Sequence, residues 1–161
     1  MLDARCRNPC GPEPALSKCE EMDFPRHEYK CRCPIFITGD TEARARNVVF
    51  AGANRVTIGD VAFALFLRLV VELLKSKRGM VSRRKLINGR YINADGEFQS
   101  ISRLRQAFNG ALGPLNPQEF IETCENKCSR LSVQPALIRY NKQKLLCHRN
   151  QRIRKLARRL P

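Results

Sequence analysis

The stretch "VAFALFLRLVVELL" (residues 61–74) is the most hydrophobic in the chain, and it predicts a helix that is buried on most of its circumference. We expect this helix to begin at Asp60, whose side chain can cap it, and to run to about Lys77, before Gly79. The stretch is too short to span a bilayer and contains an arginine and a glutamate, so no membrane partner is expected. The helix should instead form the centre of a globular core.

Three short runs before this helix predict strands. The runs "IFIT" (residues 35–38), "NVVFAG" (residues 47–52) and "NRVTIG" (residues 54–59) are rich in β-branched and aromatic residues, and glycine and asparagine punctuate them. Such short runs, divided by turn-forming residues, indicate a small antiparallel sheet. The fold class is therefore predicted to be α+β.

Downstream, the stretch "SISRLRQAFNGAL" (residues 100–112) separates on a helical wheel into an apolar and a polar side. The apolar residues, at spacings of three and four, are Ile101, Leu104, Phe108 and Ala111. The residues that follow the same rhythm on the other side are Gln99, Arg103, Gln106 and Gly110. The second side carries hydrogen-bond donors suited to phosphates and base edges, and no acidic residue occurs between Phe98 and Pro114.

A short helix and a hairpin are expected on either side of this amphipathic helix. Ser82 is a suitable N-cap for a helix that carries Leu86 and Ile87 inward, and either Gly89 or "NADGE" (residues 93–97) is expected to end this helix in a turn. The run "EFIETCENKCSRLSV" (residues 119–133) alternates around a polar tip, as a hairpin does. This order of elements is typical of a winged helix-turn-helix, in which the second helix of the pair enters the major groove.

Three motifs in register resemble the winged-helix output domains of OmpR- and PhoB-type response regulators. They are "VSRRKL" (residues 81–86), "ISRLRQAF" (residues 101–108) and "IETCENKCSRL" (residues 121–131). The upstream run "NRVTIGDVAFALFLRL" (residues 54–69) is similar to the strand, turn and first core helix of that family. The chain departs from the family at the wing tip, where Gly-x-Gly-Tyr is replaced, and the 34 residues before the domain are too few for a receiver domain.

The resemblance implies which residues contact DNA. On and beside the second helix of the pair these are Gln99, Ser102, Arg103, Arg105, Gln106 and Asn109. At the start of the preceding helix and on the wing they are Ser82, Arg83, Arg84, Lys127 and Arg130, which would hold phosphates. Arg103 suits guanine, and Gln99 and Gln106 suit adenine, as base-reading side chains. For Arg105 an intramolecular salt bridge with Glu97 or Glu122 is the alternative.

The N-terminal segment, residues 1–34, is loop-like and holds five of the eight cysteines. Soft ligands on a short segment without a core favour a structural zinc site, and free or redox-active thiols are the alternative. The preferred ligands are Cys6, Cys10, Cys31 and Cys33, with Cys19 or His27 as a substitute for the fourth. On the hairpin, Cys124 and Cys128 are expected to be ordinary strand residues, although they could pair or face the N-terminal cysteines.

The last part of the chain, residues 136–161, is predicted to be a basic helical extension that follows a domain at residues 35–135. From residue 126 onward the chain has eleven basic and no acidic side chains. A single helix is expected from about Asn141 to Leu160, with an apolar stripe made by Leu146, Ile153, Leu156 and Leu160. It could dock on the domain with its cationic side along DNA, pair with another copy, or lie on an anionic membrane, in that order of preference.

A formal net charge of +15 favours a polyanionic partner, and no targeting sequence or motif of an enzyme is found. The chain is accordingly predicted to be a sequence-specific, double-stranded DNA-binding protein, cytoplasmic and nucleoid-associated, that regulates transcription. RNA polymerase and a second copy of the chain are further expected partners. The alternative is a winged-helix protein that binds RNA or another protein, such as a ribosome- or polymerase-associated factor.

Overall fold

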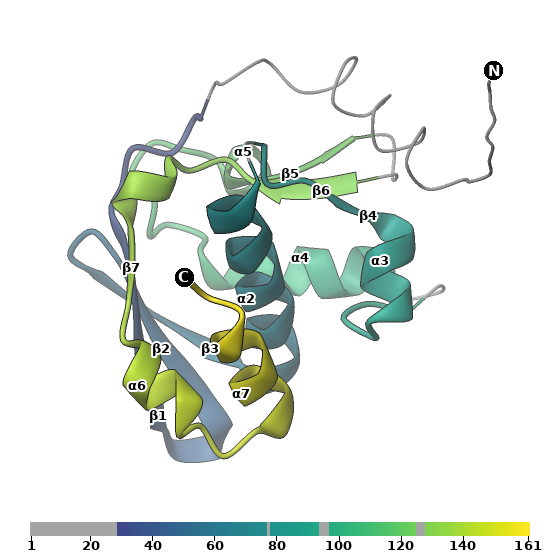
Figure 1. Cartoon of the computed structure of the whole chain (residues 1–161). Coiled ribbons are helices and arrows are strands. Elements are labelled where there is room, and N and C mark those ends of the chain that lie inside the picture. Colours follow the sequence, from purple (N-terminus) through teal and green to yellow (C-terminus); the bar gives the residue numbers. More distant parts are fainter. Residues whose placement is uncertain (1–28, 77, 94–96, 125–127) are drawn as a thin grey trace, which may run out of the picture.

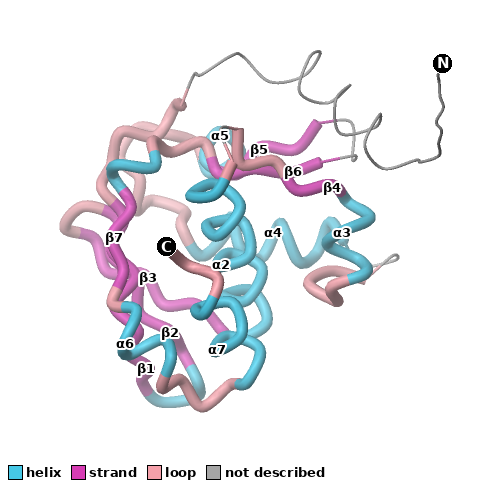
Figure 2. The backbone as a smooth tube through the Cα atoms, viewed as in Figure 1, coloured by secondary structure: helices cyan, strands magenta, loops and turns pink. Residues whose placement is uncertain are grey.

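The computed structural model describes residues 29–76, 78–93, 97–124 and 128–161, and these form an α+β fold (Figure 1). The long helix α2 (Asp60–Lys75) lies at the centre, as its hydrophobic sequence predicts. A four-stranded sheet, a three-stranded sheet and the remaining helices surround it (Figure 2). Across the described ranges, none of the helices has the length and apolar character that crossing a membrane requires.

The four-stranded sheet contains the three predicted strands and one that was not predicted. Strands β1 (Ile35–Glu42), β2 (Arg46–Ala51) and β3 (Asn54–Gly59) pair antiparallel, as predicted for these three runs. Strand β7 (Ile138–Tyr140) then adds to the free edge of β1 in parallel, so the sheet is mixed, in the order β3-β2-β1-β7. The C-terminal part of the chain thereby becomes part of the first sheet.

The start of α2 differs from the prediction. Gly59 occupies the N-cap position without a side-chain hydrogen bond, and Asp60 is already the first residue of the helix. The carboxylate of Asp60 instead accepts hydrogen bonds from side chains outside the helix, so its predicted capping role is wrong. At the other end α2 stops at Lys75, and Gly79 follows with a φ of +67°. A Cβ there would lie 2.8 Å from the Cα of Leu73, so only glycine fits.

The second sheet and two helices follow in the predicted order. Strand β4 (Val81–Ser82) leads into α3 (Arg83–Asn88), where the Ser82 hydroxyl accepts a hydrogen bond from the Lys85 amide and confirms the predicted N-cap. The next elements are α4 (Glu97–Ala107), α5 (Pro117–Phe120), β5 (Ile121–Cys124) and β6 (Cys128–Leu131). Strands β5 and β6 form the predicted hairpin, and β4 pairs with β6 in the order β4-β6-β5.

The predicted single C-terminal helix is wrong, because the chain breaks it in two. After the 3₁₀ turn η2 (Pro135–Leu137) and β7 come α6 (Lys142–Leu146) and α7 (Gln151–Arg158). Asn150 caps α7, since its side-chain oxygen accepts from the amides of Arg152 and Ile153. Leu145 rather than Leu146 is fully buried, and Ile153, Leu156 and Leu160 join the same core as α2. Residues 136–161 are thus packed into the main core.

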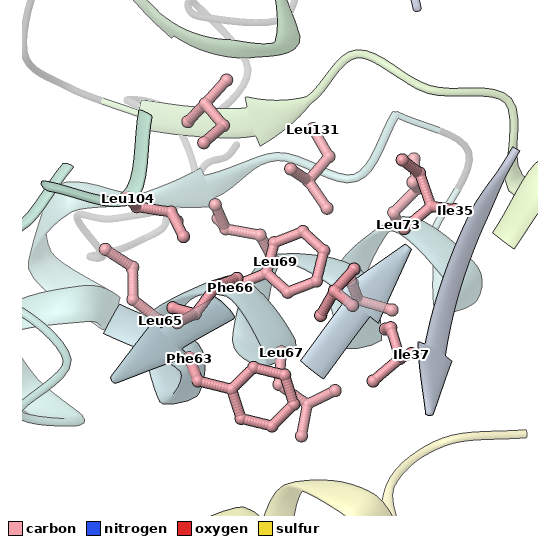
Figure 3. Close-up of a cluster of buried hydrophobic side chains, with 14 of the residues drawn as sticks. Ile35, Ile37, Phe63, Leu65, Phe66, Leu67, Leu69, Leu73, Leu104 and Leu131 are labelled. Atoms are coloured by element: carbon pink, nitrogen blue, oxygen red, sulfur yellow. The ribbon is translucent and has the colours of Figure 1, made fainter. Parts of the chain in front are cut away.

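The core is centred on the side chains of α2 (Figure 3). The ring centroids of Phe66 of α2 and Phe108 are 5.3 Å apart, and those of Phe108 and Phe120 of α5 are 4.8 Å apart. These aromatic contacts join α2 to the segment after α4 and to the start of the hairpin. Leu104 of α4 is completely buried beside them. The position of α4 therefore depends on packing against α2.

A buried polar network joins the C-terminal segment to the start of α2. His148 Nε2 lies 2.7 Å from the side-chain oxygen of Asn47, whose amide nitrogen donates to Asp60 at 2.9 Å. The backbone N–H of Asn150 donates a hydrogen bond to His148 Nδ1. Nδ1 is therefore the acceptor, and Nε2 carries the proton of the neutral imidazole. Arg149 then binds the second Asp60 oxygen at 2.8 Å. Burial lowers the pKa of His148, in spite of the opposing charge of Asp60.

Leu104→Ala is expected to destabilise the protein by about 2–5 kcal/mol, since it opens a cavity where α4 meets α2. The neighbouring exposed change Arg103→Ala should alter the free energy of unfolding by less than about 0.5 kcal/mol. Urea unfolding followed by circular dichroism measures both variants. Equal effects of the two changes would contradict the division of α4 into a buried and an exposed side.

His148 is expected to make the fold sensitive to acid. Because its folded pKa lies below the ordinary value of 6.5, the unfolded chain binds the proton more readily, and stability falls as the pH drops below about 6.5. The charged groups around the ring are Asp60, Arg149 and Arg154. Urea unfolding at pH 7.5 and 5.5 measures the loss, and the variant His148→Gln should show a smaller pH-dependent loss. An NMR titration that puts the His148 pKa above 6.5 would overturn this expectation.

Candidate nucleic-acid interface

Helix α4 has one buried and one exposed side, as its sequence predicts. Buried residues along the predicted stripe are Ile101, Leu104, Phe108 and Ala111. The exposed residues are Gln99, Ser102, Arg103, Gln106 and Asn109. The helix ends at Ala107, so Asn109 lies in the turn that follows rather than on the helix itself. A rigid row of polar side chains therefore faces solvent along α4.

Arg105 points toward the hairpin rather than away from the molecule. Its Nε and Nη2 atoms donate to the carbonyl oxygen of Ile121 at 3.0 and 2.5 Å. The alternative salt bridge with Glu122 is not formed, because that carboxylate is paired with Arg130. The side chain of Glu97, the other partner considered, lies outside the described residues. Arg105 is half-buried and ties α4 to β5, so its described contacts are structural.

The side chain of Arg130, on β6, is buried, although the resemblance implies a phosphate contact for it. Its side chain is 1% exposed, lies 3.4 Å from the Glu122 carboxylate and covers the ring of Tyr29 at 5.5 Å. A guanidinium held in this way does not reach a ligand at the surface. Lys127, the other predicted wing contact, lies outside the residues that the structure describes.

Helix α3 presents cations next to α4. Arg84 and Lys85 are exposed, and Arg83 is half-buried. Ser82 is buried, and its hydroxyl is engaged as the N-cap of the helix. The observed role of Ser82 is therefore structural. Lys85 is an exposed cation on α3 that the resemblance to the family did not identify as a candidate contact. Its exposed position one turn after the cap could have identified it.

Three adjoining hollows run from α4 to α7. The first, about 500 Å³, lies between the start of α2 and α4 and is lined by Arg46, Val61, Arg103 and Gln106 among others. The second, about 400 Å³, shares Val61 with the first and includes Arg90, Tyr91 and Ser100. The third, about 640 Å³, shares Arg90 and Tyr91 with the second and is bounded by α7. Each hollow thus shares lining residues with the next, and the three hollows together are called the α4–α7 surface.

The charge along this surface is positive because the described carboxylates are mostly engaged elsewhere. The ion pairs away from it are Asp40–Lys144, Glu42–Arg55, Arg68–Glu72 and Glu122–Arg130. Asp60 lines the first hollow, but Arg149 pairs with it. Among the described residues, no carboxylate forms an ion pair with Arg84, Arg90 or Arg103. The surface can therefore attract a polyanion.

Of the predicted zinc ligands, Cys31 and Cys33 fall within the described residues. Cys31 is 2% exposed, and burial raises the pKa of its thiol, which favours the neutral form over the thiolate that binds zinc. Cys6, Cys10, Cys19 and His27 lie outside the described residues. Within residues 29–161, where described, no cluster of three or more metal-binding side chains occurs. The zinc site stays a prediction.

Cys124 and Cys128 lie directly opposite each other on β5 and β6. Both are buried and form a small cluster with Met80, which precedes β4. They contribute apolar packing at the point where the three-stranded sheet meets α3.

No family model matches the sequence, and neither the curated proteins nor the solved structures include a significant match.

Proposed function

We propose that the chain is a sequence-specific double-stranded DNA-binding protein, a regulator of transcription, that reads the major groove with α4. The observation that carries the proposal is the exposed row of Gln99, Arg103 and Gln106 on a helix that buries Ile101 and Leu104 on its other side. A major groove about 12 Å wide admits one helix, and a rigidly held helix can present its side chains to base edges.

The proposal includes a winged helix-turn-helix domain at residues 35–135, whose helices and wing lie between about residues 60 and 133. Its support is the order α2, β4, α3, α4 and the hairpin β5–β6, together with the pairing of β4 on β6. In this arrangement α4 is the second helix of the pair and the hairpin is the wing. RNA polymerase and a second copy remain proposed partners of the bound regulator.

The roles of individual side chains follow from their chemistry. Arg103 would donate two hydrogen bonds to guanine, and Gln99 and Gln106 would each pair with adenine. Arg84 and Lys85 of α3 would contact backbone phosphates and hold α4 in register. Arg105 and Arg130 make contacts within the protein instead. Arg105 binds α4 to β5, and Arg130 is buried against Glu122 of the hairpin.

The experiment has two steps. Selection of bound fragments from a random pool of duplexes first identifies the preferred sequence. The affinity of the Arg103→Ala variant is then compared on that sequence and on random duplex over a range of salt concentrations. Removal of one bidentate base contact should reduce the discrimination by about 1–3 kcal/mol, that is, by about 5- to 150-fold, with a nearly unchanged salt slope.

Arg139→Ala is the matched control, because Arg139 is an exposed arginine on β7, in the four-stranded sheet. It should leave the discrimination unchanged. Equal losses on both duplexes in Arg103→Ala would reject base reading by this residue. Stronger binding of the unaltered protein to structured RNA than to any duplex DNA would favour the RNA-binding alternative.

A further inference from the structure

The third hollow, which we term the α7 pocket, lies outside the predicted base-reading helix. It has a volume of about 640 Å³ and is lined by the 89–91 turn and by one side of α7. Four of its lining residues are cationic: Arg90, Arg152, Lys155 and Arg159. No acidic side chain is found among its described lining residues. Such a concentration of like charge is unfavourable unless an anion occupies it.

The pocket is built on a firmly held helix. Ile153 and Leu156 are buried at 0% and 1% exposure and fix α7 against the core. Residues 152, 155 and 159 are three and four positions apart, so their side chains project from one side of the helix. The wall provided by α7 is therefore rigid.

Arg152 connects α7 to the 89–91 turn, which forms the opposite wall of the pocket. Its guanidinium lies over the Tyr91 ring, 4.6 Å from the ring centroid, and donates a hydrogen bond to the carbonyl oxygen of Gly89. A Cβ at Gly89 would lie 2.5 Å from the Tyr91 ring, so glycine is needed where the ring packs. Both sides of the pocket are thus held in place before any ligand binds.

Arg90 stands in a backbone conformation that disfavours it. Its φ is +60°, in the left-handed region that glycine and asparagine adopt more easily. The conformation ends α3 in a Schellman motif, since the Arg90 N–H donates to the carbonyl oxygen of Ile87 and the Tyr91 N–H donates to that of Leu86. The end of α3 thereby places Arg90 in the lining of the pocket as its fourth cationic residue.

The geometry points to a binding site for a phosphate group in the α7 pocket. A phosphate carries up to two negative charges and several acceptor oxygens, which match the guanidinium and ammonium donors of Arg90, Lys155 and Arg159. In the described part of the chain none of these three side chains forms an ion pair. The phosphate could belong to a nucleic-acid backbone or to a free phosphorylated ligand, and the site does not require base reading by α4.

Two variants of the full chain test the site. Arg90→Gly removes one cation and relieves the backbone strain, so it should be at least as stable as the unaltered protein. The double variant Lys155→Ala/Arg159→Ala removes two exposed cations, one from α7 and one from its C-cap. The control Arg158→Ala makes the same type of change on the same helix, at an exposed residue that does not line the pocket.

The first measurement is calorimetric titration with inorganic phosphate and with pyrophosphate in a chloride buffer. If the pocket takes free phosphates, the double variant should bind them at least about tenfold more weakly, because it removes two charged hydrogen-bond donors. Arg90→Gly should also weaken binding, and Arg158→Ala should not. This result would identify a free phosphorylated ligand as one source of the phosphate.

The second measurement is the salt dependence of binding to a random-sequence duplex. If the pocket holds a backbone phosphate, the double variant should reduce the slope of log K against log salt by about 0.9 for each phosphate that the protein no longer neutralises. The Arg158→Ala variant should keep the slope of the unaltered protein. The site is overturned if the pocket variants match the control in both measurements. Because neither measurement needs a specific sequence, failure here is separate from failure of Arg103 to read bases.

Discussion

The burial of α2 is the constraint on which the rest of the structure depends. Ten of its sixteen residues are buried, so other elements must cover it on nearly every side. The four-stranded sheet, α4, β6 and α7 each provide part of this cover. The exposed polar row of α4 and the cationic side of α7 both result from this packing. Each helix buries its apolar side on α2, so its polar side faces solvent.

Asp60 is the second constraint, since it joins segments that are distant in the chain. Its carboxylate accepts hydrogen bonds from Asn47 of β2 and from Arg149 and Asn150 of the C-terminal segment. The buried part of this network is satisfied only when His148 is neutral. The same aspartate lines the hollow beside Arg103, so the link between the sheet and the C-terminal segment adjoins the proposed interface.

The elements that could be predicted from the sequence are those specified by residues close together in the chain. The periodicity of residues 60–75 and 97–107 and the β-branched runs before them correspond to the observed helices and strands. Strand β7 was missed because it has three residues and pairs with β1 about a hundred positions away. The burial of Arg130 depends on its cross-strand partner Glu122, a pairing that the hairpin register could have revealed. The α7 pocket was missed because it needs the 89–91 turn and α7 together.

The central claim is that the exposed side of α4 contacts duplex DNA. An NMR titration of the full chain with a selected duplex, followed through backbone and side-chain N–H signals, tests it most directly. The account predicts the largest shifts at Gln99, Ser102, Arg103 and Gln106, with smaller shifts on α3 and little change on the four-stranded sheet. Shifts concentrated on that sheet, around the exposed Phe36, with α4 unchanged, would contradict it.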